Sequence, residues 1–464
     1  MVRRNFNRKL YNPVNCSPHS ALCTVEPNTE DMKVAICGGG IGGLVCAIAL
    51  SEYPNIDVEV YEKNSSFEEI GAGISLWPRA WKILRRMGLE KDLLEQTHNQ
   101  PREEVTIAIR LMANDETRLH TYDVKGKGAV FSSFHRADFQ RVLLKHLPAA
   151  CKVNFSKHLE SFAHTAHSYI ELRFRDGDSS ACDILVGADG IRSSVRRCML
   201  AEQAIEASRT YTDQVPCPYA ESLLSGVEPQ RTGIILYRAV FPAWKLRTKW
   251  PGHAVFKHTI QYQGKIAHLI AYAISRGELI NIGIVDFHPD SSTLQDVVER
   301  LEILSEGWDP EIMAIVDCIE EIKPWVVWVV PSLQSFVHKR VVLLGDSAHA
   351  MIPFLGSGAG QAIEDADILA TLLGHATPSG HTAEEALEVY DSIRRPFAQG
   401  VALKSEHQGH IYSEIHQPES HEWFQDHFIG VGQRMTANLE WTWATTIDGM
   451  REQALQMLEE SIRA

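Results

Sequence analysis

The pattern of apolar and polar positions changes period twice near the start of the chain. Residues 34–37 form a short apolar run, and after a group of glycines residues 44–50 form a second one. The first run is typical of a buried parallel strand, and the second continues as a buried helix. Residues 57–62 then alternate and end in an acid. Strand, helix and strand in this order predict the βαβ unit of a parallel sheet.

Short elements continue to alternate through the first half of the chain. Apolar residues at helical spacing predict a helix over 81–89 and an amphipathic helix over 135–147, which Pro148 ends. The run Gly126-Lys127-Gly128 is expected to interrupt the strands around it. Runs rich in β-branched and aromatic residues predict strands at 105–111, 117–122, 129–134, 153–155, 169–174 and 181–186.

The second half of the chain shows a different order of predicted elements, with mostly strands. Between about 205 and 332 a single helix is expected, at about 293–304, among strands at 233–241, 253–262, 266–275 and 279–287. Their hairpin-like spacing predicts an antiparallel sheet. A buried parallel strand then begins at Arg340 and ends in Gly345-Asp346. Residues 361–373 are expected to form a long helix, and the chain from Ala383 onward is expected to be helical.

The glycines between the first strand and helix form the pattern G-x-G-x-x-G at Gly38, Gly40 and Gly43. Such glycines permit a tight turn, close approach of the backbone to a pyrophosphate and close packing of helix on strand, respectively. The start of the helix offers free N–H groups to phosphates. Glu62 follows Gly43 by 19 residues, where a carboxylate can accept from a ribose hydroxyl. The motif predicts a dinucleotide site; the alternative is a glycine-rich helix start without a ligand.

The composition excludes several classes of function. The 464 residues include 45 basic and 59 acidic side chains, a formal net charge of −14, which argues against a nucleic-acid partner. The nine cysteines form no C-x-x-C pair, so we expect free thiols in a reducing, cytoplasmic compartment. Residues 1–31 lack the apolar core of a secretory signal and are expected to be a disordered tail; mitochondrial import is less favoured. No apolar run is long enough to predict a membrane span.

Three signals now stand in one chain: the glycine motif with Glu62, the run from Gly187 to Gly190 (Gly-Ala-Asp-Gly), and Gly345-Asp346. Together they resemble the single-component FAD-dependent aromatic hydroxylases, the class of para-hydroxybenzoate and salicylate hydroxylases. The resemblance covers about residues 34–375. Trp77-Pro78-Arg79 and residues 358–365 look like the fungal phenol-hydroxylating branch of that class.

The resemblance implies an α/β fold with a Rossmann-type, glutathione-reductase-like FAD-binding domain and a mostly antiparallel substrate domain. The FAD-binding domain is expected to be discontinuous, with pieces at 32–105, 133–205 and 335–375. The substrate domain is expected at 106–132 and 206–334, and a helical region at 376–464.

The resemblance also implies which residues meet FAD. Gly38, Gly40 and Gly43 would hold the pyrophosphate, Glu62 the adenosine ribose, and Asp346, after Gly345, the ribityl chain. The remaining FAD residues implied are Gly71, Ala72 and Gly73 near the isoalloxazine ring, Gly358 and Ala359 at its pyrimidine edge, Arg136, and Asp189 near FAD or NAD(P)H. For Arg136 the alternative is a salt bridge at a helix start, and for Asp189 it is an N-cap.

The chemistry implied is that of the cofactor. NAD(P)H would reduce the flavin, and dioxygen would form a flavin C4a-hydroperoxide that hydroxylates an electron-rich aromatic ring such as a phenolate. Two strand residues match positions that dearomatising phenol hydroxylases use for the phenolate: Arg238, which would stabilise it, and Tyr272, which would orient it. The alternatives are an edge charge for Arg238 and core packing for Tyr272. The chain departs from the family pattern at Phe354-Leu355, where relatives commonly have His-Gln.

We therefore expect a monooxygenase that hydroxylates a small phenolic or salicylate-like substrate, with FAD, NAD(P)H and dioxygen. The late histidines, 407 to 427, lack zinc spacing, and no metal site is expected. Rival functions are a flavin-dependent epoxidase or oxidase of a terpenoid or indole and a non-catalytic GDP-dissociation-inhibitor-like binding protein. The sequence leaves open whether the protein is a homodimer and whether it uses NADH or NADPH. It also leaves open whether the reaction is simple hydroxylation, decarboxylative hydroxylation or dearomatisation.

Overall fold

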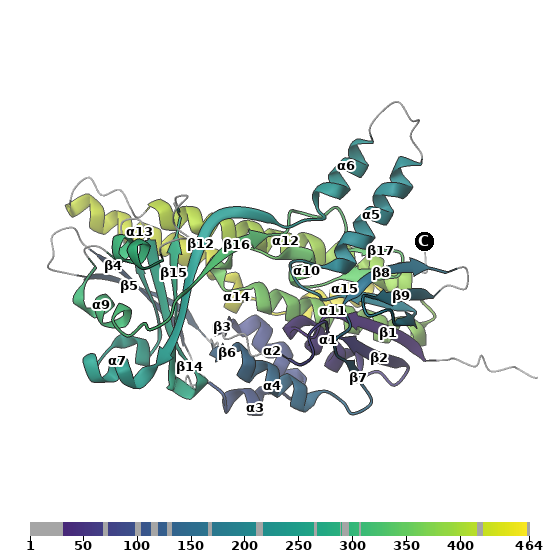
Figure 1. Ribbon diagram of the computed structural model, residues 1–464, viewed down its shortest axis with the longest axis horizontal. Coiled ribbons are helices and arrows are strands. Elements are labelled where there is room, and N and C mark those ends of the chain that lie inside the picture. The colour runs from purple at the N-terminus through teal and green to yellow at the C-terminus, as the bar shows by residue number, and fades with distance from the viewer. Residues whose placement is uncertain are drawn as a thin grey trace, which may run out of the picture.

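The computed structural model of the chain describes most of its residues from 31 onward. The described ranges are 31–67, 73–97, 104–112, 119–127, 132–165, 169–209, 217–263, 267–287, 289, 297–305, 308–414 and 421–461. Two sheets stand at opposite ends of an elongated body, and long helices run between them (Figure 1).

A six-stranded sheet forms one end of the body, and its order is β17-β18-β11-β1-β2-β7. All neighbours pair in parallel except β17 and β18. The order reverses at β1, which lies between β2 and β11, as in a doubly wound fold. The parallel sheet predicted from the apolar runs is confirmed. Its strands are β1 (Met32–Cys37), β2 (Ile56–Tyr61), β7 (Lys152–Asn154), β11 (Ile184–Gly187), β17 (Val337–His338) and β18 (Val341–Leu343).

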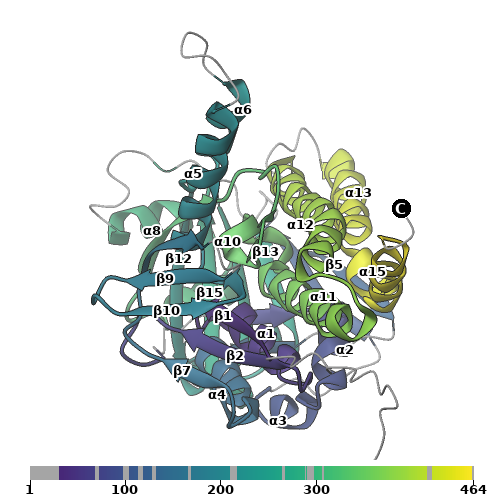
Figure 2. The same ribbon diagram turned by 90° about the vertical axis from the view of Figure 1, so that its right-hand side faces the viewer.

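Helices α1 (Ile41–Leu50) and α11 (Gly358–Ser379) pack together against this sheet, and a three-stranded antiparallel sheet lies on its other side (Figure 2). That small sheet consists of β8 (Leu159–His164), β9 (Ile170–Phe174) and β10 (Ser179–Cys182). The prediction of a single strand over 181–186 was wrong, because the chain leaves the small sheet after β10 and enters the six-stranded sheet at β11. Between β10 and β11, the Asp183 carboxylate accepts a hydrogen bond from the Lys33 N–H at 2.8 Å, which ties the crossover to β1.

A seven-stranded sheet of order β16-β12-β15-β14-β13-β4-β5 forms the other end. It is antiparallel apart from the pair β13 and β4, so the mostly antiparallel expectation is confirmed. The strands are β4 (Glu104–Met112), β5 (Leu119–Lys127), β12 (Gln230–Pro242), β13 (Thr259–Gln263), β14 (Ala267–Ile274), β15 (Leu279–Asp286) and β16 (Lys323–Val329).

The two faces of this sheet differ. Tyr237, Ile282 and Tyr262 belong to the apolar face, which packs under three short helices. The opposite face carries Arg238, Tyr272 and other polar residues, because side chains alternate along each strand. The covering helices are α7 (Ala243–Lys249), α8 (Val297–Ser305) and α9 (Pro310–Val316).

Two expected strand boundaries were wrong for identifiable reasons. The first part of 253–262 is not a strand: the His253 ring accepts from the Val255 N–H and starts the 3-10 turn η1 (Ala254–Phe256). At the other site, β5 continues through Gly126 instead of stopping there. A β-carbon at Gly126 would lie 2.7 Å from the ring of Trp443, so this glycine serves close packing and not a turn.

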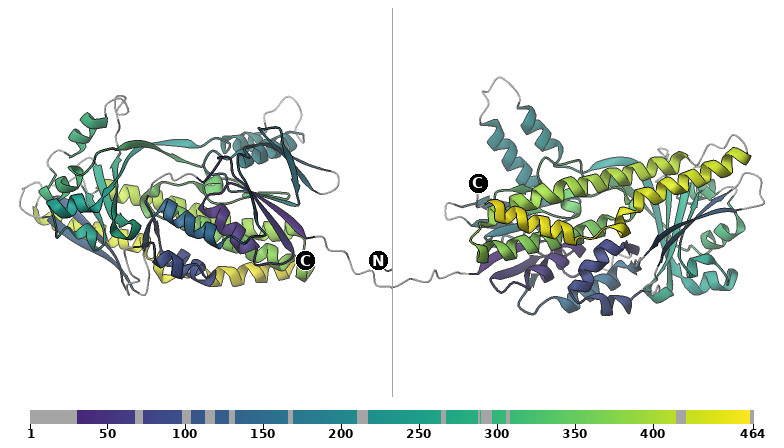
Figure 3. Two further views of the ribbon diagram at one scale, coloured as in Figure 1. Left: turned by 60° about the horizontal axis from the view of Figure 1, so that its bottom comes forward. Right: turned by 180° about the vertical axis from the view of Figure 1, so that it is seen from behind.

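The C-terminal region is helical, as predicted. Helix α12 (Ala383–Glu414) follows the long axis of the body beside α11 and α15 (Figure 3). Helix α13 (His421–Leu439) returns along it and packs on β5. The other C-terminal elements are α14 (Trp441–Ala444) and α15 (Asp448–Ser461).

The remaining elements connect these layers. Helices α5 and α6 pack on each other and project from the body (Figure 1). A helix after Asp189 was implied by the N-cap alternative, whereas α6, α7 and α9 contradict the single helix expected between about 205 and 332. The connecting elements are β3 (Gly73–Leu76), α2 (Pro78–Arg86), α3 (Glu90–Leu94), β6 (Ser132–His135), α4 (Arg136–His146), α5 (Ser194–Ser208), α6 (Pro218–Ser225), η2 (Ser275–Gly277), α10 (Asp346–His349) and η3 (Pro353–Leu355).

Two further observations concern the whole fold. The cysteines that the structure describes are all free thiols, as expected. In the same part of the chain, no helix combines the length and the apolar character needed to cross a membrane.

Candidate active site

The sequence signals converge on one edge of the six-stranded sheet. The glycine motif follows β1, Glu62 follows β2, Asp189 follows β11 and Gly345-Asp346 follows β18. Backbone hydrogen bonds hold these strand ends together: Gly38 N–H donates to the Tyr61 carbonyl at 2.9 Å, and Leu344 N–H donates to Gly187 at 3.0 Å. Ligands of doubly wound sheets bind beyond the carboxyl ends of the strands where the order reverses. Here that point is β1.

The three glycines of the motif have different surroundings. A β-carbon at Gly38, whose φ is +110°, would overlap the Ala188 carbonyl, and one at Gly43 would overlap the Gly38 carbonyl. Gly40 differs, because nothing lies within 4 Å of the place where its β-carbon would be. Gly40 is the N-cap of α1, and no side chain caps this helix. The first and third glycines therefore serve packing, whereas open space and free N–H groups at Gly40 fit a phosphate.

Glu62 is buried beside this helix start. One carboxylate oxygen accepts from the Gly39 N–H at 2.8 Å, and the other accepts from the Asn64 N–H at 2.9 Å. Both bonds fix the carboxylate at the end of β2. Each oxygen still has a second lone pair that can accept from a ribose hydroxyl.

Asp189 lies just before α5, whose N-cap residue is Ser193. Its carboxylate accepts hydrogen bonds from the Ser193 hydroxyl and from the N–H groups of Ser194 at 2.7 Å and Val195 at 3.2 Å. Burial raises the pKa of Asp189, and these hydrogen bonds lower it in part. The alternative that Asp189 is the N-cap residue was wrong, since Ser193 holds that position, but the Asp189 carboxylate does satisfy N–H groups of the first turn. A contact with FAD stays a prediction.

Gly345 and Asp346 lie at the start of α10. Gly345 has φ of +60°, and its N–H donates to the Asp365 carboxylate at 2.9 Å. Asp346 is exposed, so its carboxylate can accept from a ligand. Nothing lies within 4 Å of a β-carbon built at Gly358, where α11 begins, and Ala359 is half-buried beside it.

A buried ionic network that was not predicted lies behind this loop. The Asp365 carboxylate accepts from His349 Nε2 at 2.6 Å and from Arg394 Nε at 2.8 Å. The neighbouring carboxylate of Glu364 accepts from Arg394 at 3.0 Å and from Arg79 at 2.8 Å. Burial raises the pKa of Asp365, but His349 and Arg394 more than offset this and bring it to about 2. A sequence signal existed, since Glu364, Asp365 and Asp367 lie among the apolar residues of one helix.

The substrate sheet meets the nucleotide layer at Gly73. A β-carbon at Gly73 would lie 2.5 Å from the Tyr272 hydroxyl oxygen, and the Gly73 N–H donates to Asn281 Oδ1 at 2.9 Å. Burial raises the pKa of Tyr272 to about 12, although Arg238 and the Ser75 hydroxyl act to lower it. Tyr272 is therefore a neutral phenol at neutral pH and can donate a hydrogen bond. Gly71 and Ala72 fall outside the described residues.

Arg238 lies on the same face as Tyr272. The register pairs Arg238 with Gly283 and Tyr272 with Asn281, two residues apart on β15. Burial lowers the pKa of the Arg238 guanidinium; Tyr272 raises it, and Arg136 lowers it. Arg238 also lies 5.5 Å from the centre of the Trp325 ring.

Arg136, the first residue of α4, is exposed. It forms no ion pair with the described residues, so the helix-start salt bridge is not seen there. Its positive charge lowers the pKa of the Arg238 guanidinium, so an anionic ligand would be favoured by both groups.

Phe354 and Leu355 face protein and not the strand ends. The Phe354 ring lies 5.6 Å from the rings of both His268 and Tyr412, measured between centroids. Leu355 is buried, and its carbonyl accepts from Trp77 Nε1 at 2.7 Å. Together they anchor the loop before α11 between the sheet and α12.

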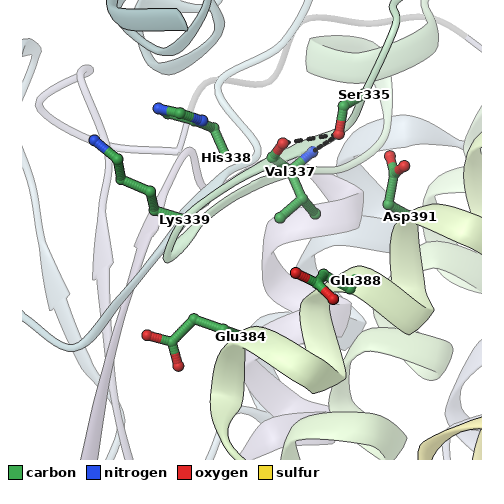
Figure 4. A pocket seen from close by; sticks show the side chains of 7 residues that line it. All are labelled: Ser335, Val337, His338, Lys339, Glu384, Glu388 and Asp391. Atoms are coloured by element: carbon green, nitrogen blue, oxygen red, sulfur yellow. Dashed lines mark hydrogen bonds between the residues drawn. The ribbon is translucent and has the colours of Figure 1, made fainter. Parts of the chain in front are cut away.

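A separate pocket of about 280 Å³ lies near α12 (Figure 4), lined by residues that include His338, Lys339 and Glu384. It contains none of the expected site residues. Beside it, Glu202, Glu206 and His338 are close enough to hold a cation. Lys339 Nζ already lies 2.7 Å from Glu202 and 2.6 Å from Glu206, so an ammonium supplies the positive charge.

The chain matches a family model described as an FAD binding domain over residues 31–239 and 286–405. It is 30% identical over 448 residues to a salicylate hydroxylase of Pseudomonas putida, covering 91% of this chain and 95% of that one. It is 30% identical to the FAD-dependent monooxygenase str9 of Strobilurus tenacellus, with 93% and 98% covered. A solved salicylate hydroxylase substrate complex superposes with a TM-score of 0.71 at 27% identity, covering 92% of this chain and 98% of that one.

Proposed function

The chain belongs to the FAD binding domain family and is an FAD-dependent monooxygenase of aromatic substrates, and from this premise we propose that it uses NAD(P)H to hydroxylate a small phenol or salicylate-like compound. The relatives that share nearly its whole length include salicylate hydroxylases. This likeness supports the substrate class.

FAD fits the residues that the fold brings together. Gly40 and the uncapped start of α1 leave room and N–H donors for the pyrophosphate. Glu62 is held where it can accept from the adenosine ribose, and Asp346 is exposed at the end of β18. The start of α11 at Gly358 offers further N–H groups to the flavin ring. When bound, the flavin supplies the activation of dioxygen and the transfer of one oxygen atom.

The observation that carries the proposal is the contact between Gly73 and Tyr272, with Arg238 on the same face. This contact places Tyr272, a neutral phenol, against β3, and Arg238, a cation, lies on the same face of the substrate sheet. A guanidinium lowers the pKa of a bound phenol and holds the phenolate, which is the electron-rich form of the ring. Tyr272 Oη donates to the same oxygen and orients the ring.

The buried network behind the site would hold the flavin loop in position. His349, Asp365 and Arg394 connect α10, α11 and α12 by bonds of 2.6 to 2.8 Å within the protein core. His349 Nδ1 has no partner among the described residues, so the network is not fully satisfied. Its proposed role in the reaction is to position the loop.

The division into domains also belongs to the proposal. Residues 32–105, 133–205 and 335–375 would form the FAD-binding domain, and 106–132 with 206–334 the substrate domain. The positions of the two large sheets support this division.

The test is a panel of phenols and salicylates incubated with the purified yellow protein and either NADH or NADPH. The expected result is reductant consumption with a product that has gained one oxygen. Loss of carbon dioxide together with that gain would identify decarboxylative hydroxylation. Peroxide formation with no oxygenated product from any phenol would refute the proposal and favour an oxidase.

A further inference from the structure

Buried side chains without hydrogen-bond partners gather on β13, which lies next to the strand of Tyr272 and three strands from that of Arg238. Gln263 is 0% exposed, and neither atom of its amide has a partner among the described residues. Gln261 Nε2 and Thr259 Oγ1, also buried, have none either. These three residues alternate along one strand, so they share one face. Buried polar groups without partners are rare in native cores and call for an explanation such as a ligand or a water.

Helix α12 packs against these β13 side chains. The Tyr412 hydroxyl donates to Gln261 Oε1 at 3.3 Å, and Gln408, one helical turn earlier, lies beside that hydroxyl. Gln408 is fully buried, and its Oε1 accepts from Asn438 Nδ2 at 2.8 Å. The ring of Phe354, from the loop before α11, packs on the Tyr412 ring, with 5.6 Å between their centroids. The amides therefore lie next to the loop that is expected to meet the flavin.

The strand register connects this cluster to the proposed phenolate site. Arg238 pairs with Gly283, Gly283 with Ile270, and Ile270 with Gln261. The four residues form one row across the sheet, and the side chains of Arg238, Ile270 and Gln261 point to the same face. Three strand spacings separate Arg238 from Gln261, about 14 Å between Cα atoms. The row therefore has a cation, Arg238, at one end and a neutral amide, Gln261, at the other, with Gly283 and Ile270 between them.

We infer, on the basis of the proposed function, that the substrate carries a second, neutral polar group on the side of its ring away from the phenolic oxygen, and that Gln261 and Gln263 bind it. A carbonyl or a hydroxyl is the chemical class that fits. A primary amide can donate to a carbonyl oxygen and accept from a hydroxyl.

The cluster disfavours a carboxylate at that position. Thr259, Gln261, Gln263, Gln408 and Tyr412 are neutral groups, and a buried anion without a cationic partner is costly. His268 is a titratable group on this face: it pairs with Gln263, and its ring centroid lies 4.9 Å from that of Tyr412. A neutral imidazole adds no charge to the cluster. Arg110 pairs with Tyr262 on the apolar face and forms an ion pair with Glu311.

The test compares phenols of matched shape bound to the holoenzyme. The probes are 3- and 4-hydroxyacetophenone, which carry a neutral carbonyl, the corresponding isopropylphenols, and the corresponding hydroxybenzoates. Equilibrium dissociation constants come from the change in flavin absorbance on titration, so turnover is not needed. We expect at least one acetyl compound to bind about tenfold or more tightly than its isopropyl and carboxylate counterparts, the scale of one or two hydrogen bonds.

The double variant Gln261→Leu/Gln263→Leu locates the effect. We expect it to lose the preference for the acetyl compound. Its melting temperature should change little, because the leucines remove three unpaired amide atoms but also the Gln261 acceptor of the Tyr412 hydroxyl. The surface substitution Gln456→Leu is the control and should change neither quantity.

Three results would overturn the inference. They are the absence of an acetyl preference in the wild-type protein, a preference that survives in the double variant, and no binding of any of these phenols. The wild-type measurement decides the question even if the double variant fails to fold. A wild-type enzyme that hydroxylates phenols without this preference would contradict the inference and leave the proposed function standing. A protein that prefers the acetyl compound but oxygenates nothing would contradict only the proposed function.

Discussion

The hydroxyl of Tyr272 occupies the space in front of Gly73, so that a β-carbon at Gly73 would lie 2.5 Å from that oxygen. Gly73 begins β3 beside the nucleotide layer, and Tyr272 lies on β14 of the substrate sheet. Any side chain at position 73 must displace the tyrosine ring. The two parts of the proposed active site are therefore in direct contact.

We expect Gly73→Ala to reduce hydroxylation by about 10- to 100-fold, because a shift of about 1 Å in a positioned group costs that much. The protein should stay yellow, since the phosphate-binding motif is untouched. Product formation and flavin content are measured together. Gly252→Ala, where nothing lies within 4 Å of the new β-carbon, is the control. Unchanged product formation in the Gly73 variant would show that Tyr272 can move freely.

The glycines of the nucleotide motif should separate into two groups. Gly40→Ala should fold normally but retain little FAD, because its β-carbon would occupy only the space left for phosphate. Gly43→Ala should lower the melting temperature even without FAD, because its β-carbon would overlap the Gly38 carbonyl. Flavin absorbance and thermal unfolding of the apoprotein give the two readings. The control is Gly400→Ala within α12, where nothing lies within 4 Å of the new β-carbon. Full flavin content in the Gly40 variant would contradict the assignment.

Arg238→Ala and Tyr272→Phe should each lower hydroxylation by roughly 10²-fold while FAD stays bound, the scale of losing a positioned electrostatic or proton-donating group. Turnover is followed by product mass. Arg231→Ala is a matched control, since Arg231 lies on the same strand and stacks 4.9 Å from the centre of the Trp328 ring. Near wild-type turnover in both site variants would remove these residues from the mechanism.

Asp189→Ala should lower the free energy of unfolding by about 1–2 kcal/mol, because it removes the acceptor of the N–H groups of Ser194 and Val195. Chemical denaturation of the apoprotein measures this loss. A titration of the folded apoprotein with FAD gives the second reading. Weakened FAD binding with no loss of stability would favour a ligand contact over capping.

Asp365 should make stability depend on pH in acid. Its folded pKa of about 2 lies below the unfolded value of about 4, so its contribution is complete above pH 4 and disappears as the pH falls toward 2. For a shift of this size the contribution is about 2–3 kcal/mol. In Asp365→Asn the loss of stability between pH 4 and pH 2 should be smaller than in the wild type. Equal acid slopes in urea unfolding of the two proteins would contradict the role of the network.

Much of the candidate site could be predicted from local sequence. The glycine spacing, Glu62 and Gly345-Asp346 are each tied to the end of a neighbouring strand, and the order of apolar runs determined the parallel sheet. Such signals are local because strand ends, tight turns and helix starts depend on residues only a few positions apart. The spacing also predicted the close packing at Gly43 that the structure shows, whereas the phosphate contact at Gly40 stays a prediction.

The tertiary structure decided what the buried polar groups do. Asp189 belongs to a helix cap, Gly126 makes room for Trp443, and His349 joins Asp365 and Arg394, although nothing near these residues in sequence indicates their partners. The row from Arg238 to Gln261 depends on the register of four strands. Register and helix packing join residues far apart in the chain, and burial makes each unpaired polar group costly. These pairings therefore follow from the packed fold and not from the local pattern.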